Sequence, residues 1–256
     1  MFHATSRSFS SLPQLGSEEG ADAHLSAVCY GHLKPMVDFV VALLLLFLVC
    51  LPVLILIILV KLTSKGPALY SQVRLGRGER KFRIYKIRTM YDNCELQTGP
   101  CWSTPNDPRV TSLGYVLRRC HLDELPQLWN VLRGEMSLVG PRPERPEIVS
   151  ELVHVVPAYR DRLCVRPGIT GLAQVLLPPD EDLVGVRRKV KYDLFYIGQM
   201  GPWLDLRIVA ATALKLLGFS KEWRYRLVLY TVPGNPAPQS VLPREEAEGT
   251  SQVQTI

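Results

Sequence analysis

The sequence lacks the cysteine spacing that is typical of a zinc site. Its six cysteines form no C-x-x-C pair, and Cys50 lies inside a long apolar run, where a metal ligand would be out of place. We therefore interpret the cysteines as reduced thiols, which suits a protein whose working part faces the cytoplasm. Disulfides in an oxidising compartment are the alternative, because the number of cysteines is even.

Two common nucleotide-binding motifs are also missing. Gly76-x-Gly78 is too short for a dinucleotide fingerprint, and the sequence contains no G-x-x-x-x-G-K-[ST]. An NAD site and a P-loop ATPase therefore have no support. Nucleic-acid binding is a weak alternative, because the basic run that contains Tyr70, Phe82 and Tyr85 lies beside an apolar segment.

The composition excludes a wholly disordered chain and indicates an acidic partner. Of the 256 residues, 47% are hydrophobic, which is enough for a folded core. The formal net charge of +6 suits nucleic acid, an anionic membrane surface or a phosphorylated substrate. Composition alone does not choose among these three.

A long apolar run from Met36 to Val60 predicts a membrane segment. At 1.5 Å per residue a helix of this length crosses a hydrocarbon layer of roughly 30 Å. A cleaved signal peptide is disfavoured, because the run is too long, begins late and is followed by no small-residue cleavage site. Residues 61–88 then contain nine Lys or Arg and one acid, so the positive-inside rule places the C-terminal part in the cytoplasm.

Pro52 leaves two arrangements of this segment open. A proline in a helix interior removes one amide hydrogen bond and clashes with the preceding turn, so we expect a kink there. The physical argument slightly favours a spanning helix that tolerates the proline. The alternative is a re-entrant helix-break-helix, which would return both ends to the cytoplasmic face and keep Asp38 near the interface.

The residues after the run predict a β-hairpin and then a mainly helical region. Gly76 to Gly78 separates two stretches with partial period-two alternation, including Phe82 and Ile84. Further on, helical spacing groups Leu113, Val116 and Leu117, and then a second set. That second set is Leu125, Leu128, Trp129 and Leu132.

Asp123 and Glu124 form an acidic dyad just before Pro126, a residue suited to the first turn of a helix. Acids at a helix start are often only a cap. Here several cations could bind phosphate while the two acids supply a nucleophile and a metal ligand, which is what phosphoryl transfer needs. These cations are Lys86, Arg118, Arg119, Arg142 and Arg145.

Several blocks closely resemble the bacterial sugar transferase family, the monotopic phosphoglycosyl transferases. In order they are SKGPALYSQVRLG, FRIYKIRTM, DPRVTSLGYVLRR, HLDELPQLWNVLRGEMSLVGPRPE, RPGITGLAQV and KYDLFYIGQMGPWLDLRIV. The match extends from about Lys34 to Leu217 with no block missing.

The resemblance implies a reaction. A sugar 1-phosphate moves from a UDP-sugar to polyprenyl (undecaprenyl) phosphate with release of UMP, as the first membrane step of surface glycan assembly, such as an exopolysaccharide, O-antigen, capsule or glycoprotein glycan. Asp123 matches the acid that attacks the donor's β-phosphate to form a phosphosugar-enzyme intermediate. Glu124 matches the acid that helps to bind Mg²⁺. On an α-helix these neighbours would point roughly 100° apart, so their tasks can differ.

The other site residues follow from the same blocks. Positions that resemble phosphate-binding residues of the family are Lys86, Arg88, Arg118 and Arg142. The frame of Pro141 and Pro143 is expected to fix the backbone around Arg142. Asp193 is expected to orient an arginine, although a surface salt bridge would give the same pattern.

The resemblance also implies an architecture. It favours the re-entrant helix with its break at Pro52, in an α+β fold that is mainly α with a small β-hairpin. The expected divisions are a disordered tail (1–30), the membrane helix (31–62), the transferase domain (63–219) and an extension (220–256), disordered after 234. The absence of four earlier membrane helices indicates the family's compact form. Pro35 stands where a second basic residue is usual.

The expected location is the bacterial inner membrane, with the catalytic domain on its cytoplasmic face. The expected partners are a UDP-sugar, polyprenyl phosphate and membrane lipids, with a homodimer possible and no nucleic acid. A non-catalytic, membrane-anchored module that binds anionic lipid or an assembly partner is the alternative. The intact dyad and P-R-P frame favour the enzyme. The sequence leaves the transferred sugar open.

Overall fold

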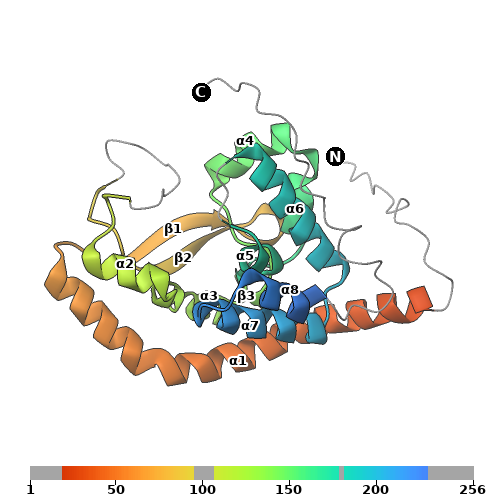
Figure 1. Ribbon diagram of the computed structural model, residues 1–256, viewed down its shortest axis with the longest axis horizontal. Helices are drawn as coiled ribbons and strands as arrows, with labels where there is room; N and C mark the ends of the chain where they lie inside the picture. The colour runs from red at the N-terminus through yellow and green to blue at the C-terminus, as the bar shows by residue number, and fades with distance from the viewer. Residues whose placement is uncertain (1–18, 95–106, 179–181, 230–256) are drawn as a thin grey trace, which may run out of the picture.

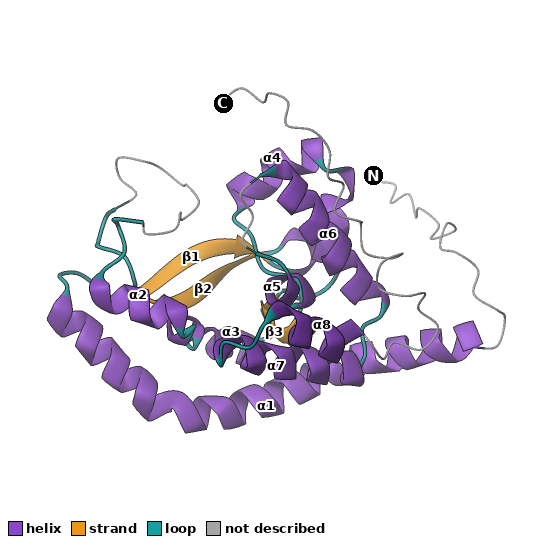
Figure 2. Ribbon diagram, in the orientation of Figure 1, coloured by secondary structure: helices purple, strands orange, loops and turns teal. Residues whose placement is uncertain are grey.

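The computed structural model describes residues 19–94, 107–178 and 182–229, with side chains from Tyr30 onward (Figure 1). Within these residues the chain is mostly helical with two small sheets (Figure 2), which confirms the predicted class. Most of the predicted tail, and the extension after Leu229, lie outside the described residues.

The first helix, α1, runs from Glu19 to Thr63 with Pro35 and Pro52 inside it. Residues 19–30 of the predicted tail are therefore helical, since adding residues to an existing helix costs little. The helix is not interrupted at the predicted break, because Pro52 lies inside one continuous α1. Figure 1 shows α1 curved along one side of the protein, with its concave side toward the other elements.

One narrow stripe of α1 contacts the rest of the protein. Tyr30, Lys34, Asp38 and Ala42 recur every fourth residue and are buried, so they share one face. The opposite faces expose large apolar side chains, and only 6% of the most apolar stretch is buried. Among the described residues this is the one helix long and apolar enough to cross a membrane.

A buried polar cluster holds the first half of α1 in place. It consists of Tyr30, Lys34, Asp38, Ser137, Tyr196 and Asp205. Lys34 pairs with Asp205, which also accepts hydrogen bonds from the hydroxyls of Tyr30 (2.7 Å) and Tyr196 (2.8 Å). The Ser137 hydroxyl donates to Asp38 at 2.6 Å. Breaking such a buried pair would leave an uncompensated charge. The cluster therefore holds the first half of α1 against the folded domain.

The predicted hairpin is confirmed. β1 (Leu69–Leu75) and β2 (Lys81–Ile87) pair antiparallel from Leu69 opposite Ile87 to Leu75 opposite Lys81. The short 3₁₀ helix η1 (Arg77–Glu79) forms the turn, where Gly78 has a φ of 64° that favours glycine. Phe82 and Ile84 alternate into the core beside α1 and α3, as their period predicts.

A second sheet was not predicted. β3 (Ser137–Val139) and β4 (Gly168–Thr170) are parallel strands of three residues each, too short to show a period. Gly140 and Gly168 permit their close approach: a Cβ on Gly168 would lie 2.1 Å from the Gly140 nitrogen. This contact fixes the chain where it leaves β3 for the P-R-P frame.

Helices complete the domain. They are α2 (Ser112–Arg119), η2 (Leu122–Glu124), α3 (Gln127–Leu132), α4 (Pro146–Val155), η3 (Pro157–Cys164), α5 (Leu172–Leu176), α6 (Leu183–Gly198), α7 (Pro202–Leu216) and α8 (Lys221–Leu229). Leu117 and Leu128, which helical spacing groups with neighbouring side chains, are buried. Val116 and Trp129, placed with them by helical spacing, are instead about half exposed, because α2 and α3 are short and bury only one narrow side.

Candidate active site

The acidic dyad lies in η2, between α2 and α3. Asp123 and Glu124 are both buried, with 7% of each exposed. His121 precedes them with a left-handed φ of 53°, which turns the chain sharply out of α2. As predicted, the dyad comes just before a helix start, but in a 3₁₀ helix. With three residues per turn the two carboxylates point roughly 120° apart, rather than 100°.

Two cations from distant parts of the chain meet on Glu124. Lys86 of β2 and Arg142, which follows β3, each bind its Oε1 atom at 2.7 Å. Burial alone would raise the pKa of Glu124, but the charges of Arg142 and Lys86 outweigh it and hold the pKa well below its usual range. Glu124 is therefore ionised at any physiological pH.

Asp123 has a different environment from its neighbour. Across the described part of the chain, no hydrogen bond or ion pair engages its carboxylate. Burial raises the pKa of Asp123 to about 6, although the charge of Lys86 opposes this. The charge of Arg118 also lowers this pKa. Near pH 7 Asp123 is thus an ionised, unpaired carboxylate beside several cations, which suits a nucleophile.

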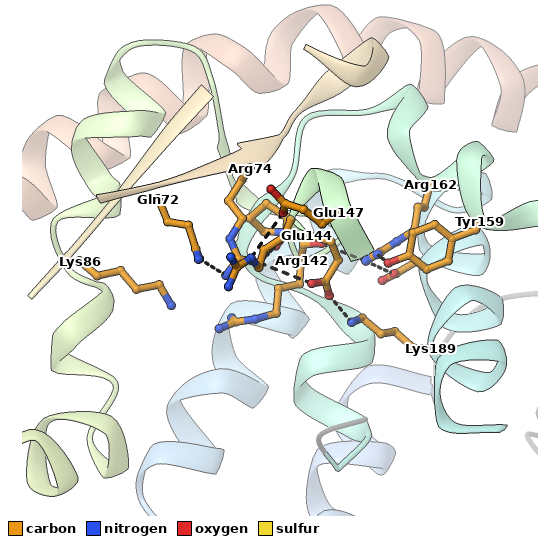
Figure 3. A network of polar contacts seen from close by, with 12 residues as sticks. Gln72, Arg74, Lys86, Arg142, Glu144, Glu147, Tyr159, Arg162 and Lys189 are labelled. Carbon is orange, nitrogen blue, oxygen red and sulfur yellow. Dashed lines mark hydrogen bonds and ion pairs between the residues drawn. The ribbon is translucent and has the colours of Figure 1, made fainter. Parts of the chain in front are cut away.

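The structure brings three of the four predicted phosphate-binding residues to the dyad. Arg118 of α2 lies near Asp123 and donates from Nε to the Thr89 hydroxyl at 2.8 Å. Lys86 and Arg142 bind Glu124, and Figure 3 shows their side chains pointing toward the same region. The phosphate-binding roles themselves stay predictions.

Arg88 is engaged elsewhere. Its guanidinium donates to the carbonyls of Ser64 (3.0 Å) and Lys65 (2.6 Å) and to the Ser64 hydroxyl (2.6 Å), just beyond the end of α1. Because β2 ends at Ile87, the alternation of side chains between the two faces of the strand does not extend to Arg88. Its contacts favour a structural task at the end of α1.

The expected orienting pair of Asp193 exists, and its partner is Arg162, at 2.7 Å. Both side chains are almost completely buried, so this is no surface salt bridge. Arg162 in turn donates to the carbonyl of Arg142, between Pro141 and Pro143. Sequence reasoning missed Arg162, and with it Glu144 and Lys189 (Figure 3), because no local pattern links positions so far apart.

The dyad fits a magnesium ion better than a metal held by protein alone. No group of three or more His, Cys, Asp or Glu side chains that could hold a metal occurs in the ranges that the structure describes. Mg²⁺ is usually bound by one or two carboxylates, with water and substrate phosphates completing its shell. Both cations bind Oε1 of Glu124, which leaves Oε2 and Asp123 as the oxygens for such an ion.

Comparison with known proteins finds a matching family and several similar sequences. The sequence model of the family described as bacterial sugar transferase matches residues 29–218. A UDP-N-acetylgalactosamine-undecaprenyl-phosphate N-acetylgalactosaminephosphotransferase of Aeromonas hydrophila is 41% identical over 193 residues, which are 75% of this chain and 45% of that protein.

Two further relatives carry different names. A UDP-glucose:undecaprenyl-phosphate glucose-1-phosphate transferase of Caulobacter vibrioides is 43% identical over 188 residues (72% of this chain, 69% of that protein). The exopolysaccharide production protein PSS of Rhizobium leguminosarum bv. phaseoli is 40% identical over 166 residues (62% and 82%). The chain spans less than half the length of several curated relatives that it matches.

Proposed function

Because the chain belongs to the bacterial sugar transferase family, we propose that it transfers a sugar 1-phosphate from a UDP-sugar to undecaprenyl phosphate and releases UMP. The observation that carries this proposal is the contrast within the dyad. Glu124 is bound by two cations, whereas Asp123 is buried, ionised near pH 7 and has no ion-pair partner among the residues that the structure describes. Such a pair separates a nucleophile from a group that organises phosphate charge.

The reaction proceeds in two displacements at phosphorus. An Asp123 oxygen attacks the donor's β-phosphorus, the bond to the bridging oxygen breaks, and UMP leaves with the electron pair. An oxygen of undecaprenyl phosphate then attacks the same phosphorus and displaces Asp123, which gives the lipid diphosphate sugar and restores the carboxylate. The covalent step divides one difficult transfer into two easier ones.

The cations of the site have to accept a highly charged donor. Arg142 and Lys86 bind the β-phosphate oxygens, on which charge stays through the displacement, and Arg118 lies on the Asp123 side. Glu124 would hold Mg²⁺, which would neutralise part of the diphosphate charge so that the Asp123 carboxylate can approach the phosphorus. The burial of the dyad strengthens each of these interactions.

We further propose that α1 enters the membrane from the cytoplasmic side and returns, without crossing. Both limbs of α1 support this, because Lys34 and Asp38 contact the folded domain near one end and Val60 packs against it near the other. The two ends of a helix that spanned the bilayer would lie on opposite sides of it, so both ends could not contact the same folded domain. Exposed apolar side chains of α7 give the domain a further lipid-facing surface. They are Trp203, Leu206, Val209 and Leu216.

The test is UMP release from UDP-glucose, UDP-N-acetylgalactosamine and UDP-galactose by purified protein with undecaprenyl phosphate and Mg²⁺. Asp123→Asn and Glu124→Gln should each abolish release. Without the acceptor, donor labelled in its β-phosphate should label the wild-type protein and leave Asp123→Asn unlabelled. Folded, lipid-bound wild type that releases no UMP from any donor would contradict the proposal and favour a non-catalytic anchored module.

A further inference from the structure

The backbone on either side of Arg142 is held at every carbonyl. Four successive residues, Pro141 to Glu144, each accept one hydrogen bond from a different partner. The donors, in order, are the Gly168 amide (2.9 Å), Arg162 Nη2 (3.0 Å), Arg74 Nη1 (3.3 Å) and the Leu75 amide (3.0 Å). We call this segment the clamped loop. The clamped loop follows β3 of the second sheet and contains Arg142, one of the two cations that bind Glu124.

The bond from Arg162 is the one that acts on Arg142 itself. The two prolines fix their own φ angles, and Pro143 restricts Arg142 to an extended conformation. Pro143 limits the ψ of Arg142 to roughly +120 to +160°, and within that range the direction of the Arg142 carbonyl can still vary. Arg162 donates to that carbonyl, so it fixes the carbonyl's direction within the range that the P-R-P frame allows.

Arg162 is itself rigidly placed. Its side chain is 2% exposed, pairs with Asp193 at 2.7 Å and donates to the Tyr159 hydroxyl at 2.9 Å. Asp193 lies on α6 and Tyr159 on η3, so two elements of the core support one guanidinium. Figure 3 shows Arg162 and Tyr159 on one side of the loop and the Arg142 side chain leaving on the other.

The following residue is held in the same manner. Glu144 binds Lys189 at 2.6 Å and Arg74 at 3.5 Å, and burial of this carboxylate is outweighed by these charges, so that its pKa falls to about 2. Arg74 therefore binds both the Glu144 carboxylate and the Pro143 carbonyl. No substrate atom is needed to explain any of these contacts.

We propose that Arg162, supported by Asp193, is a positioning residue that orients Arg142 toward Glu124 and the donor phosphates by fixing its carbonyl. The inference rests on the proposed function, because Arg142 is assigned there to the phosphates. Residues that orient the groups touching a ligand commonly cost 10–100-fold in activity when removed, and we expect about that loss here.

The main variant replaces both partners, Arg162→Met with Asp193→Val, so that no buried charge is left unpaired. A second variant, Arg74→Met, removes the bond to the Pro143 carbonyl while Glu144 keeps Lys189. The matched control is Arg160→Met, which removes the same charge from η3 at an exposed pair with Glu79. Each change is made in the full chain in detergent, in wild type and in Arg142→Gln.

The measured quantities are the melting temperature and kcat/KM for the UDP-sugar that gives UMP with wild type. In a wild-type background the paired variant should lower kcat/KM by about 10–100-fold, and the control should not. In the Arg142→Gln background it should lower kcat/KM by less than about 3-fold, because its effect passes through Arg142. A merely structural role would lower activity equally in both backgrounds.

The outcomes separate the two proposals. Equal losses in both backgrounds, or full activity of the paired variant, would overturn the positioning role while leaving the transferase activity intact. Should the paired variant not fold, Arg74→Met decides by the same comparison. A wild type that releases no UMP from any donor overturns the proposed function instead, and the inference falls with it.

Discussion

Replacing Glu144 by Gln should destabilise the protein in a pH-dependent way. The charges of Lys189, Arg162 and Arg74 together outweigh burial and lower the pKa of Glu144 to about 2, from an ordinary 4.5. At 1.36 kcal/mol per unit this difference corresponds to about 3 kcal/mol of folding free energy at pH 7. For a domain of this size that is a fall of about 6 to 12 °C in melting temperature.

The sign follows from the lowered pKa. The folded protein holds Glu144 ionised, so its contribution is complete above about pH 4.5, where the unfolded chain is also ionised, and is lost as the pH falls toward 2. By pH 3 about 2 kcal/mol of the 3 should be gone. The difference in melting temperature between wild type and Glu144→Gln should therefore be large at pH 7 and shrink at pH 3.

The assay is thermal unfolding of detergent-purified protein at both pH values, followed by intrinsic fluorescence. Glu147→Gln is the matched control, because its carboxylate is exposed and its contact with Arg145 at 3.5 Å is a surface pair of little worth. The reasoning is refuted if Glu144→Gln melts within about 2 °C of wild type at pH 7. It is also refuted if the difference is the same at pH 3.

Three further predictions concern other parts of the fold. Arg88→Gln should lower the melting temperature without raising KM for the donor. Lys86→Gln should instead lower kcat/KM by about 10–100-fold. Equal effects of the two variants on KM would show that Arg88 does belong to the phosphate site. Gly168→Ala should lower the melting temperature strongly, because its Cβ would lie 2.1 Å from the Gly140 nitrogen. The control Gly198→Ala has open space around the new Cβ and should leave the melting temperature unchanged. Similar melting temperatures of the two variants would contradict the close packing of β3 and β4. Asp205→Asn should loosen the first half of α1, because it weakens the pair with Lys34. Proteolysis near the start of α1 should then be faster than in wild type. An unchanged rate of cleavage would contradict a role of this pair in holding α1.

Local patterns were sufficient where one stretch of chain carries its own physical signal. The apolar run predicts α1 because its length matches a hydrocarbon layer, and the glycine-centred alternation predicts β1 and β2. The dyad before Pro126 was placed just ahead of a helix start, where the structure also has it. The same reasoning grouped Val116 and Trp129 with side chains that are buried, yet both are about half exposed, since periodicity shows which side chains share a face but not how much of that face another element covers.

The sequence by itself determined the long apolar helix, the hairpin, the family and the position of the acidic dyad, because each depends on neighbouring residues or on ordered blocks. The tertiary structure decided which cations reach that dyad. It brought Lys86 and Arg142 to one oxygen of Glu124 and assigned Arg88 to the end of α1. Within the described ranges it gave Asp123 no ion-pair partner. It also placed Arg162 beneath Arg142. Charged side chains can pair across any separation in sequence, so only the folded backbone selects their partners.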